Sequence, residues 1–263
     1  MNVFVTGASG WIGSAVVPQL LAAGHQVVGL ARSDGAAAAV AALGAEVRRG
    51  DLDDLDSLRA GAEASDGVIH LGFKPDVADF AGAGRTERDA TPMVGPEAPR
   101  GGAEELALSY AERGVRSVSL RFALTVHGAG DHGFVPTLVG VARERGTSCY
   151  VGAGTNRWPA VHRLDAARLV RSALERSPAG SVVHGVAEEG VPTRAIAEAI
   201  GRGLGVPVRS VDPDDAAGHF GWIGMFFAVD APASSALTRD RLGWTPTQPG
   251  LIEDLDAGSY FRT

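Results

Sequence analysis

The chain has 263 residues, of which 24 are basic and 31 acidic, and its formal net charge is −7. This length can bury a full core as one α/β domain or as one domain with a smaller appendage. The acidic balance argues against a nucleic-acid or anionic-membrane partner. The single cysteine, Cys149, excludes an internal disulfide and a cysteine-based metal cluster, so we expect no metal and a reducing compartment.

No apolar run approaches the roughly 20 residues needed to cross a bilayer, and the N-terminus is typical of a core strand rather than a leader. We therefore expect a cytoplasmic protein.

The first thirteen residues are typical of a dinucleotide-binding turn. An apolar run at residues 2–5 predicts a strand, closely spaced glycines follow it, and a helix is predicted next. Such a turn presents free backbone N–H groups and a positive helix end to a pyrophosphate. Gly7 would allow the tight turn, Gly10 the close approach of the phosphate, and Gly13 the close packing of helix on strand. A glycine-rich turn without a ligand is the alternative, and the surrounding strand and helix order favours the cofactor.

Strands and helices alternate along the chain. Strands are predicted over residues 2–5, 26–30, 45–49, 67–72, 115–121, 181–186 and 206–211, and helices over 15–23, 35–43, 55–62, 104–113, 164–176, 192–203 and 251–260. Gly114 is expected to cap the helix before it. This alternation predicts an α/β fold with a doubly wound parallel Rossmann sheet.

Five motifs in order carry a family resemblance. They are Thr6-Gly7-x-x-Gly10-x-x-Gly13, Gly50-Asp51-Leu52, residues 121–128, residues 161–167, and Leu242-Gly243-Trp244-x-Pro246. With them the chain resembles the extended short-chain dehydrogenase/reductase family, the relatives of NAD(P)-dependent epimerases and dehydratases, over nearly its whole length. We expect a dinucleotide-binding Rossmann domain of residues 1–128 plus 159–178, and a smaller substrate-binding lid of residues 129–158 plus 179–263.

The tip of the second strand indicates which cofactor is bound. NAD-binding relatives carry an acidic residue there, whereas this chain has Arg32 and Ser33. Arg32 can form a bidentate contact to a 2′-phosphate and Ser33 can donate a further bond, so we predict NADP; the alternative is a solvated surface arginine. With these two residues, the resemblance implies a cofactor site of Gly7, Ser9, Gly10, Trp11, Ile12, Gly13, Arg32, Ser33, Asp51, Leu52, Leu71, Gly72, Phe73, Arg100, Phe122 and Thr125.

The usual catalytic pair of the family, Tyr-x-x-x-Lys, is absent. Pro96 stands at the place of the tyrosine and Arg100 at that of the lysine, and the chain has a single lysine, Lys74. An arginine can hold a ribose but cannot give up its proton. His127 and His132 are the candidate proton donors, because both are expected on a loop at the carboxyl end of the nicotinamide-facing strand. Two surface histidines without a catalytic role are the alternative.

The second half of the chain is expected to form the substrate lid. Its most aromatic stretch, residues 219–227, suits either an apolar pocket or a lid helix that packs its own core. Basic residues are sparse here, with Arg157 the main exception, which favours an uncharged organic carbonyl over a nucleotide-sugar. We therefore predict an NADPH-dependent reductase of an uncharged organic ketone or enone. The alternative is a non-catalytic NADP-binding sensor or interaction protein. The resemblance implies a homodimer through the helices bordering residues 104–113.

One strand that the family needs is missing from the sequence. The resemblance requires a central strand carrying a Ser or Thr between Phe73 and Val115, yet residues 84–102 contain three prolines and no run of four apolar residues. We predict that residues are skipped between about Ala83 and Thr91, either left out of the sequence as printed or deleted from the protein. A deletion would favour the non-catalytic alternative.

Overall fold

The structure is a computed structural model that describes residues 1–72, 86–89 and 101–262. Contacts between residues divide it into two compact units, Met1–Asp76 with Ala166–Ser177 and Val77–Asp165 with Pro178–Thr263. The two units are defined by how densely their residues contact one another. The predicted Rossmann and lid regions are defined by their expected functions, and they stay a prediction. No helix in the described part of the chain is long and apolar enough to cross a membrane.

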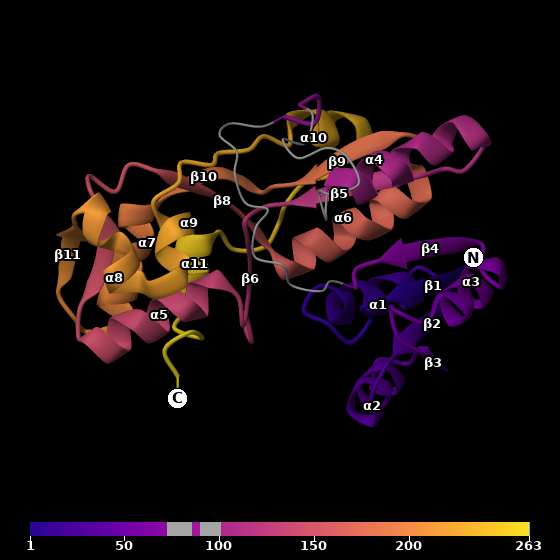
Figure 1. The fold of residues 1–263 in the computed structure, drawn as a ribbon, viewed down its shortest axis with the longest axis horizontal. Coiled ribbons are helices and arrows are strands. Elements are labelled where there is room, and N and C mark those ends of the chain that lie inside the picture. Colours follow the sequence, from indigo (N-terminus) through magenta and orange to yellow (C-terminus); the bar gives the residue numbers. More distant parts are fainter. Residues whose placement is uncertain (73–85, 90–100, 263) are drawn as a thin grey trace. The chain divides into compact units, whose positions relative to one another are not determined.

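The first unit is a parallel four-stranded sheet with the strand order β3-β2-β1-β4 (Figure 1). Its elements are β1 Asn2–Thr6, α1 Gly13–Ala22, β2 Gln26–Ala31, α2 Asp34–Ala42, β3 Glu46–Arg49, α3 Leu55–Glu63 and β4 Gly67–His70, with most of α6 Arg163–Arg176. Val3, Phe4 and Val5 of the inner strand β1 are fully or almost fully buried. Continuous apolar runs are typical of parallel strands covered on both faces, and the predicted α/β fold with a parallel Rossmann sheet is confirmed.

The second unit contains three smaller sheets with the orders β5-β9, β10-β8-β6 and β11-β7. Its longer helices and its strands are α4 Gly101–Ser109, β5 Val118–Phe122, β6 Thr125–His127, α5 Phe134–Arg145, β7 Ser148–Val151, β8 Arg157–His162, β9 Ser181–Gly185, β10 Glu188–Pro192, α7 Thr193–Leu204 and β11 Val208–Val211. Its shorter helical pieces are η1 Tyr110–Arg113, η2 Pro213–Asp215, α8 Ala216–Phe220, η3 Gly221–Ile223, α9 Gly224–Phe227, α10 Ala236–Leu242 and α11 Leu251–Asp256.

The parallel strands do not form one continuous sheet among the described residues. β4 pairs with β1, and β5 pairs with β9, but neither β4 nor β5 pairs with a further described strand. The segment in which the sequence lacks a central strand lies mostly outside the described residues, so the absence of that strand stays a prediction. The predicted point of the gap, about Ala83 to Thr91, lies outside the described residues apart from 86–89, and its location stays a prediction.

The aromatic stretch at residues 219–227 packs a core. Phe220, Ile223 and Phe227 are buried in one cluster with Trp158 of β8, whose Nε1 donates to the carbonyl of Phe226 over 3.2 Å. Of the two uses expected for this stretch, core packing is confirmed for these side chains. Burial of apolar side chains stabilises the fold by about 25 cal/mol per Å². Side chains that lined a solvent-filled pocket would not contribute this free energy.

Most predicted elements are present with shifted ends. Gly114 adopts the left-handed conformation (φ 81°) expected of a helix cap. The predicted helix over 251–260 is shorter, because α11 ends at Asp256. Sequence analysis missed α5 and the strands β7, β8 and β10, because these short strands mix polar and apolar residues and proline and show no clear period of two.

The closest backbone approach in the turn gives the first prediction. A Cβ on Gly13 would overlap the carbonyl oxygen of Gly7 and lie 2.9 Å from Cα of Ala8, whereas a Cβ on Gly35 of α2 meets nothing within 4 Å. We expect Gly13→Ala to lower the free energy of unfolding by about 1–3 kcal/mol, the usual cost of overpacking. The matched Gly35→Ala should be neutral or slightly stabilising. Denaturant unfolding measures both, and equal effects would contradict this steric argument.

Candidate functional site

The predicted phosphate-binding turn is built between β1 and α1. Gly7 has φ +70°, a conformation that side chains rarely adopt, and its carbonyl accepts from the N–H of Gly10 over 2.9 Å. Ser9 and Gly10 are exposed, Trp11 and Ile12 are half-buried, and Gly13 is buried where α1 begins. The roles expected for Gly7 in the turn and Gly13 in close packing therefore agree with the geometry.

The carboxyl ends of β1 and β4 are held together by Thr6. Its hydroxyl lies 2.7 Å from Nδ1 of His70 and accepts from the N–H of Gly72 over 3.3 Å. A Cβ on Gly72 would lie 3.0 Å from the methyl groups of Leu52, and a Cβ on Gly7 would lie 2.7 Å from the backbone of Leu71 and Gly72. The turn and the residues predicted beside it thus form one contiguous group in the first unit.

The tip of β2 carries the predicted phosphate ligand. The Arg32 side chain is 80% exposed, and its Nε lies 3.9 Å from a carboxylate oxygen of Asp51. Ser33 is the N-cap of α2, where its Oγ accepts from the N–H of Ala36 over 3.2 Å. A hydroxyl that accepts one bond still has a proton to donate.

Arg49 is a basic candidate that sequence analysis missed. It ends β3, lies beside Ala31 in the parallel register, and pairs with Asp34. The sequence could have indicated Arg49, because it ends the predicted third strand and the carboxyl ends of neighbouring parallel strands lie together. Arg32 and Arg49 thus place two guanidinium groups at the tips of adjacent strands.

Four predicted cofactor residues are not part of this group. Phe73 and Arg100 lie outside the described residues. Phe122 ends β5 and Thr125 begins β6, both in the second unit. Thr125 is buried, and its hydroxyl has no hydrogen-bond partner among the described residues.

The two candidate proton donors lie in different environments. His127 was expected on a loop, and that placement is wrong: it ends β6, is 0% exposed, and its Nδ1 lies 2.9 Å from Oδ2 of Asp254. The carboxylate therefore fixes the Nδ1–H tautomer or the charged ring. Its Nε2 is buried and has no partner among the described residues, and the ring of His162 packs edge-on at 5.3 Å. His132 is exposed on the loop after β6, as expected.

A tyrosine near the C-terminus joins this cluster. The Tyr260 hydroxyl donates to Asp131 over 3.1 Å and accepts from the N–H of Gly128 over 3.0 Å. Burial raises the pKa of Asp131 and raises the pKa of Tyr260 far above its ordinary value. Burial also lowers the pKa of His162, so that ring is neutral at pH 7. Tyr260 stays protonated and acts as a hydrogen-bond donor rather than as a base.

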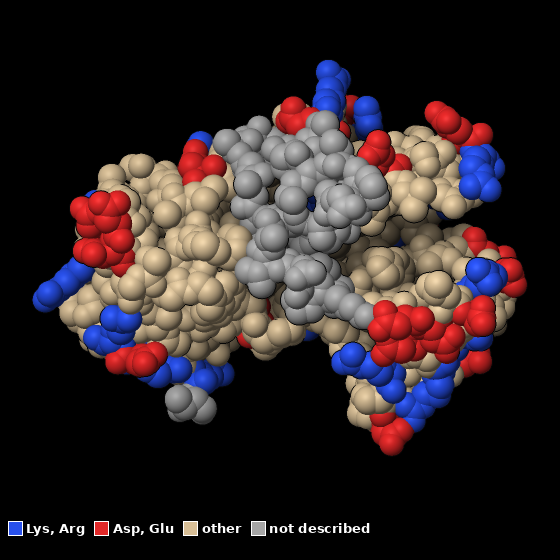
Figure 2. Space-filling view, in the orientation of Figure 1, with Lys and Arg blue, Asp and Glu red and all other residues tan. Residues whose placement is uncertain are grey.

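Surface charge in the described residues is mixed. Figure 2 shows acidic and basic side chains interspersed over the first unit, and a largely uncharged centre on the visible face of the second. On the side drawn in Figure 2, the described residues of neither unit form a broad basic area. Nucleic-acid binding would need such an area.

Comparisons with known proteins agree with the turn and the sheet. Residues 3–85 match the model of the NAD dependent epimerase/dehydratase family. The chain is 44% identical to C2A9.02 of Schizosaccharomyces pombe, an uncharacterized protein, with 99% of this chain and 100% of that protein covered. That alignment spans 295 positions, more than the 263 residues of this chain, so part of the yeast protein has no counterpart here.

Two further proteins are similar at lower identity. One is the 4-hydroxy-2-methyl-3-oxo-4-farnesyl-3,4-dihydroquinoline-1-oxide ketoreductase of Stigmatella aurantiaca, 27% identical with 69% of this chain and 67% of that protein covered. The other is the solved structure of DesIV, a dTDP-glucose 4,6-dehydratase from Streptomyces venezuelae with NAD and TYD bound. Its TM-score is 0.73 at 21% identity, with 98% of this chain and 96% of that chain covered. The structural likeness shows the fold.

Two aspartates of α11 give a matched prediction. Asp254 supports the buried ring of His127, whereas Asp256 forms an exposed ion pair with Arg202. We expect Asp254→Ala to lower the free energy of unfolding by about 1–3 kcal/mol, because a buried nitrogen loses its partner. Asp256→Ala should cost under about 1 kcal/mol, as exposed pairs do. Thermal and urea unfolding compare the two, and an Asp254→Ala protein as stable as Asp256→Ala would overturn the assignment.

Proposed function

Because this chain belongs to the NAD-dependent epimerase/dehydratase family of extended short-chain dehydrogenases/reductases, we propose that it binds NADP(H) through its first unit. The family binds NAD(P). The observation that carries the proposal is the turn from Gly7 to Gly13, in which the positive φ of Gly7 and the absence of a Cβ on Gly13 bring the start of α1 against the end of β1. Such a helix start binds a pyrophosphate.

The charge at the strand tips supports NADP over NAD. Arg32 is exposed and its Nε is 3.9 Å from Asp51, a distance too long for a hydrogen bond, so its guanidinium is available to a 2′-phosphate. Arg49 at the neighbouring tip is paired with Asp34, so Arg32 is the cation that we assign to the 2′-phosphate. Ser33 can donate to the same group.

The reaction that we propose is the NADPH-dependent reduction of an uncharged organic ketone or enone. NADPH bound at this turn would supply the hydride, and a proton would be needed at the oxygen of a ketone or the α-carbon of an enone, leaving NADP⁺. The ketoreductase relative supports this class. Arg157 is the main basic residue that could bind the phosphates of a sugar nucleotide. It donates to Asp230 over 3.0 and 2.9 Å, and this pairing favours an uncharged substrate. Trp222 and Met225, 52% and 61% exposed, offer an apolar surface.

His132 is the proton donor that fits this proposal better. It is exposed on the loop after β6, whereas His127 is buried against Asp254. A histidine ring is the side chain most often used to donate or accept a proton in catalysis. His127 then acts in support of the loop rather than by contact with substrate.

A non-catalytic NADP(H)-binding protein is the second candidate, and one observation favours it. The relative from Schizosaccharomyces pombe has residues without a counterpart here. We infer that the strand carrying the family's Ser or Thr is among them. Binding without turnover is the outcome that this candidate requires.

Cofactor preference is tested at Arg32. We expect Arg32→Ala to weaken NADPH binding roughly ten- to a hundredfold, since a charged hydrogen bond contributes about 1.5–3 kcal/mol, and to leave NADH binding nearly unchanged. Arg59→Ala, an exposed arginine of α3, is the control. Titration calorimetry gives the four affinities, and equal affinities of the unaltered protein for NADPH and NADH would contradict the proposal.

Turnover separates the two candidates. We expect oxidation of NADPH with a panel of aromatic and polyketide-like ketones, followed at the absorbance of the reduced nicotinamide. Tyr110→Phe and Tyr150→Phe should keep this activity, because no tyrosine stands at the family's catalytic position, and His132→Ala should lose most of it. Binding of NADPH with no oxidation on any ketone would favour the non-catalytic role, and loss of turnover in either tyrosine variant would refute the histidine assignment.

A further inference from the structure

The loop of residues 128–133, which follows β6, contains a tight turn around His132. Oδ1 of Asp131 accepts from the N–H of Gly133 over 2.7 Å, and the N–H of Asp131 donates to the carbonyl of Gly128 over 3.1 Å. The first bond closes a turn in which an aspartate side chain takes the place of a backbone carbonyl. His132 is the residue between the two bonded groups. The turn therefore fixes the backbone from which the exposed His132 ring extends.

The hydroxyl of Tyr260 binds this loop at two points. It accepts from the N–H of Gly128 over 3.0 Å and donates to Oδ2 of Asp131 over 3.1 Å. Asp131 is half-buried, and burial raises the pKa of its carboxyl group. A carboxylate held partly away from water needs hydrogen-bond donors. Without the hydroxyl, Asp131 would gain by rotating into solvent, and that rotation would open the turn around His132.

Tyr260 is itself held in place by packing. The rings of Tyr260 and Phe261 both pack against the apolar core of the second unit. A Cβ on Gly203 of α7 would overlap the ring of Phe261, and the carbonyl of Phe261 accepts from Arg143 of α5 over 3.4 Å. The Tyr260 hydroxyl thus reaches the loop from a segment that two helices fix.

We propose that Tyr260 is a positioning residue that orients His132 for proton donation. Tyr260 acts through Asp131 and the turn, and it does not itself donate the proton. This inference rests on the proposed function, in which His132 is the proton donor. A catalytic group has to be held within about 0.5 Å of its productive position, and a misplacement of about 1 Å can lower the rate about a hundredfold.

The first test compares Tyr260→Phe with Tyr150→Phe, a tyrosine of β7 in the same unit. We expect Tyr260→Phe to lower kcat for NADPH-dependent ketone reduction roughly ten- to a hundredfold. The KM for NADPH should stay nearly the same, because the proposed cofactor turn belongs to the first unit. Tyr150→Phe should keep both constants. Circular dichroism verifies that each variant is folded, and an unchanged kcat in folded Tyr260→Phe would overturn the proposal.

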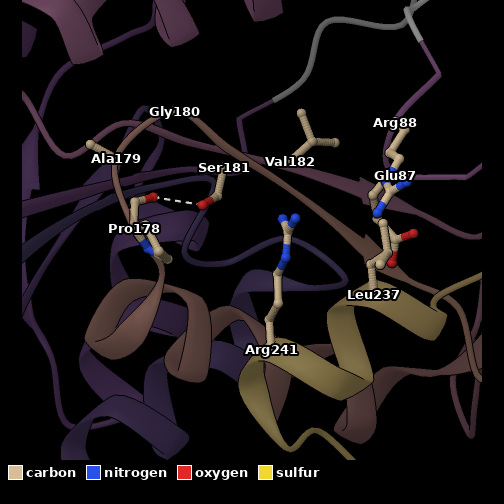
Figure 3. Close-up of a pocket in the computed structure, with 9 residues that line it drawn as sticks. All are labelled: Glu87, Arg88, Pro178, Ala179, Gly180, Ser181, Val182, Leu237 and Arg241. Carbon is tan, nitrogen blue, oxygen red and sulfur yellow. Dashed lines mark hydrogen bonds between the residues drawn. The ribbon is translucent and has the colours of Figure 1, made fainter.

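A surface substitution provides a second control. Arg241 is exposed on α10 and lines a cavity of about 420 Å³ with Leu237 and Val182, to which no residue of the loop contributes (Figure 3). Arg241→Gln should leave kcat unchanged.

A double-mutant comparison separates positioning from general support of the fold. If Tyr260 acts only through His132, Tyr260→Phe should lower kcat in the unaltered protein but should not lower the residual kcat of His132→Ala any further. The same proportional loss in both backgrounds would show a merely structural role and would contradict the proposal.

Hydrogen exchange distinguishes a failure of this inference from a failure of the proposed function. The N–H groups of Gly128 and Gly133 should exchange roughly tenfold faster in Tyr260→Phe, whereas those within α7 should keep their rates. If the unaltered protein binds NADPH but reduces no ketone, the proposed function fails, and the exchange rates still decide whether Tyr260 holds the turn. Unchanged rates at Gly128 and Gly133 would overturn the inference whatever the turnover.

Discussion

The first unit depends on one steric constraint, the contact between the start of α1 and the end of β1. At Gly13 the helix comes so close to the turn that a Cβ would overlap the carbonyl oxygen of Gly7. This closeness lets α1 begin directly beside the end of β1, so that the positive end of the helix lies at the carboxyl end of the strand. Thr6 then joins the ends of β1 and β4 through His70 and Gly72. The surface that we propose for the cofactor therefore depends on backbone packing more than on charged side chains.

The sequence was informative where a residue's role is local. Gly7, Gly13 and Gly114 have conformations or neighbours that only glycine suits, so their positions in the sequence predicted the turn and a helix end. Continuous apolar runs likewise located the parallel strands. The pairing of His127 with Asp254 was not predictable, because the two are 127 positions apart and neither belongs to a local pattern. Arg49 was missed for the same reason: its neighbours are set by strand register.

The segment between Phe73 and Val115 shows what a family resemblance alone can and cannot supply. The resemblance carried the fold, whereas the loss of a central strand stays a prediction from the prolines and short apolar runs of that segment. Catalysis in this family depends on that strand and on a tyrosine and a lysine that this chain lacks. The glycine turn and the catalytic residues thus have separate sequence requirements. A chain can keep the turn without keeping the residues that catalyse the reaction.

The contacts of Tyr260 also bear on how the chain is made. Gly128 and Asp131 form hydrogen bonds with Tyr260, about 130 positions later in the chain. His127 pairs with Asp254, which is 127 positions later. The second unit therefore cannot complete its core until almost the whole chain has left the ribosome, whereas β1, β2 and β3 of the first unit pair over short intervals. Long-range closure slows folding, and N-terminal regions fold first during synthesis. During synthesis the second unit is therefore the part of the chain whose core is completed last.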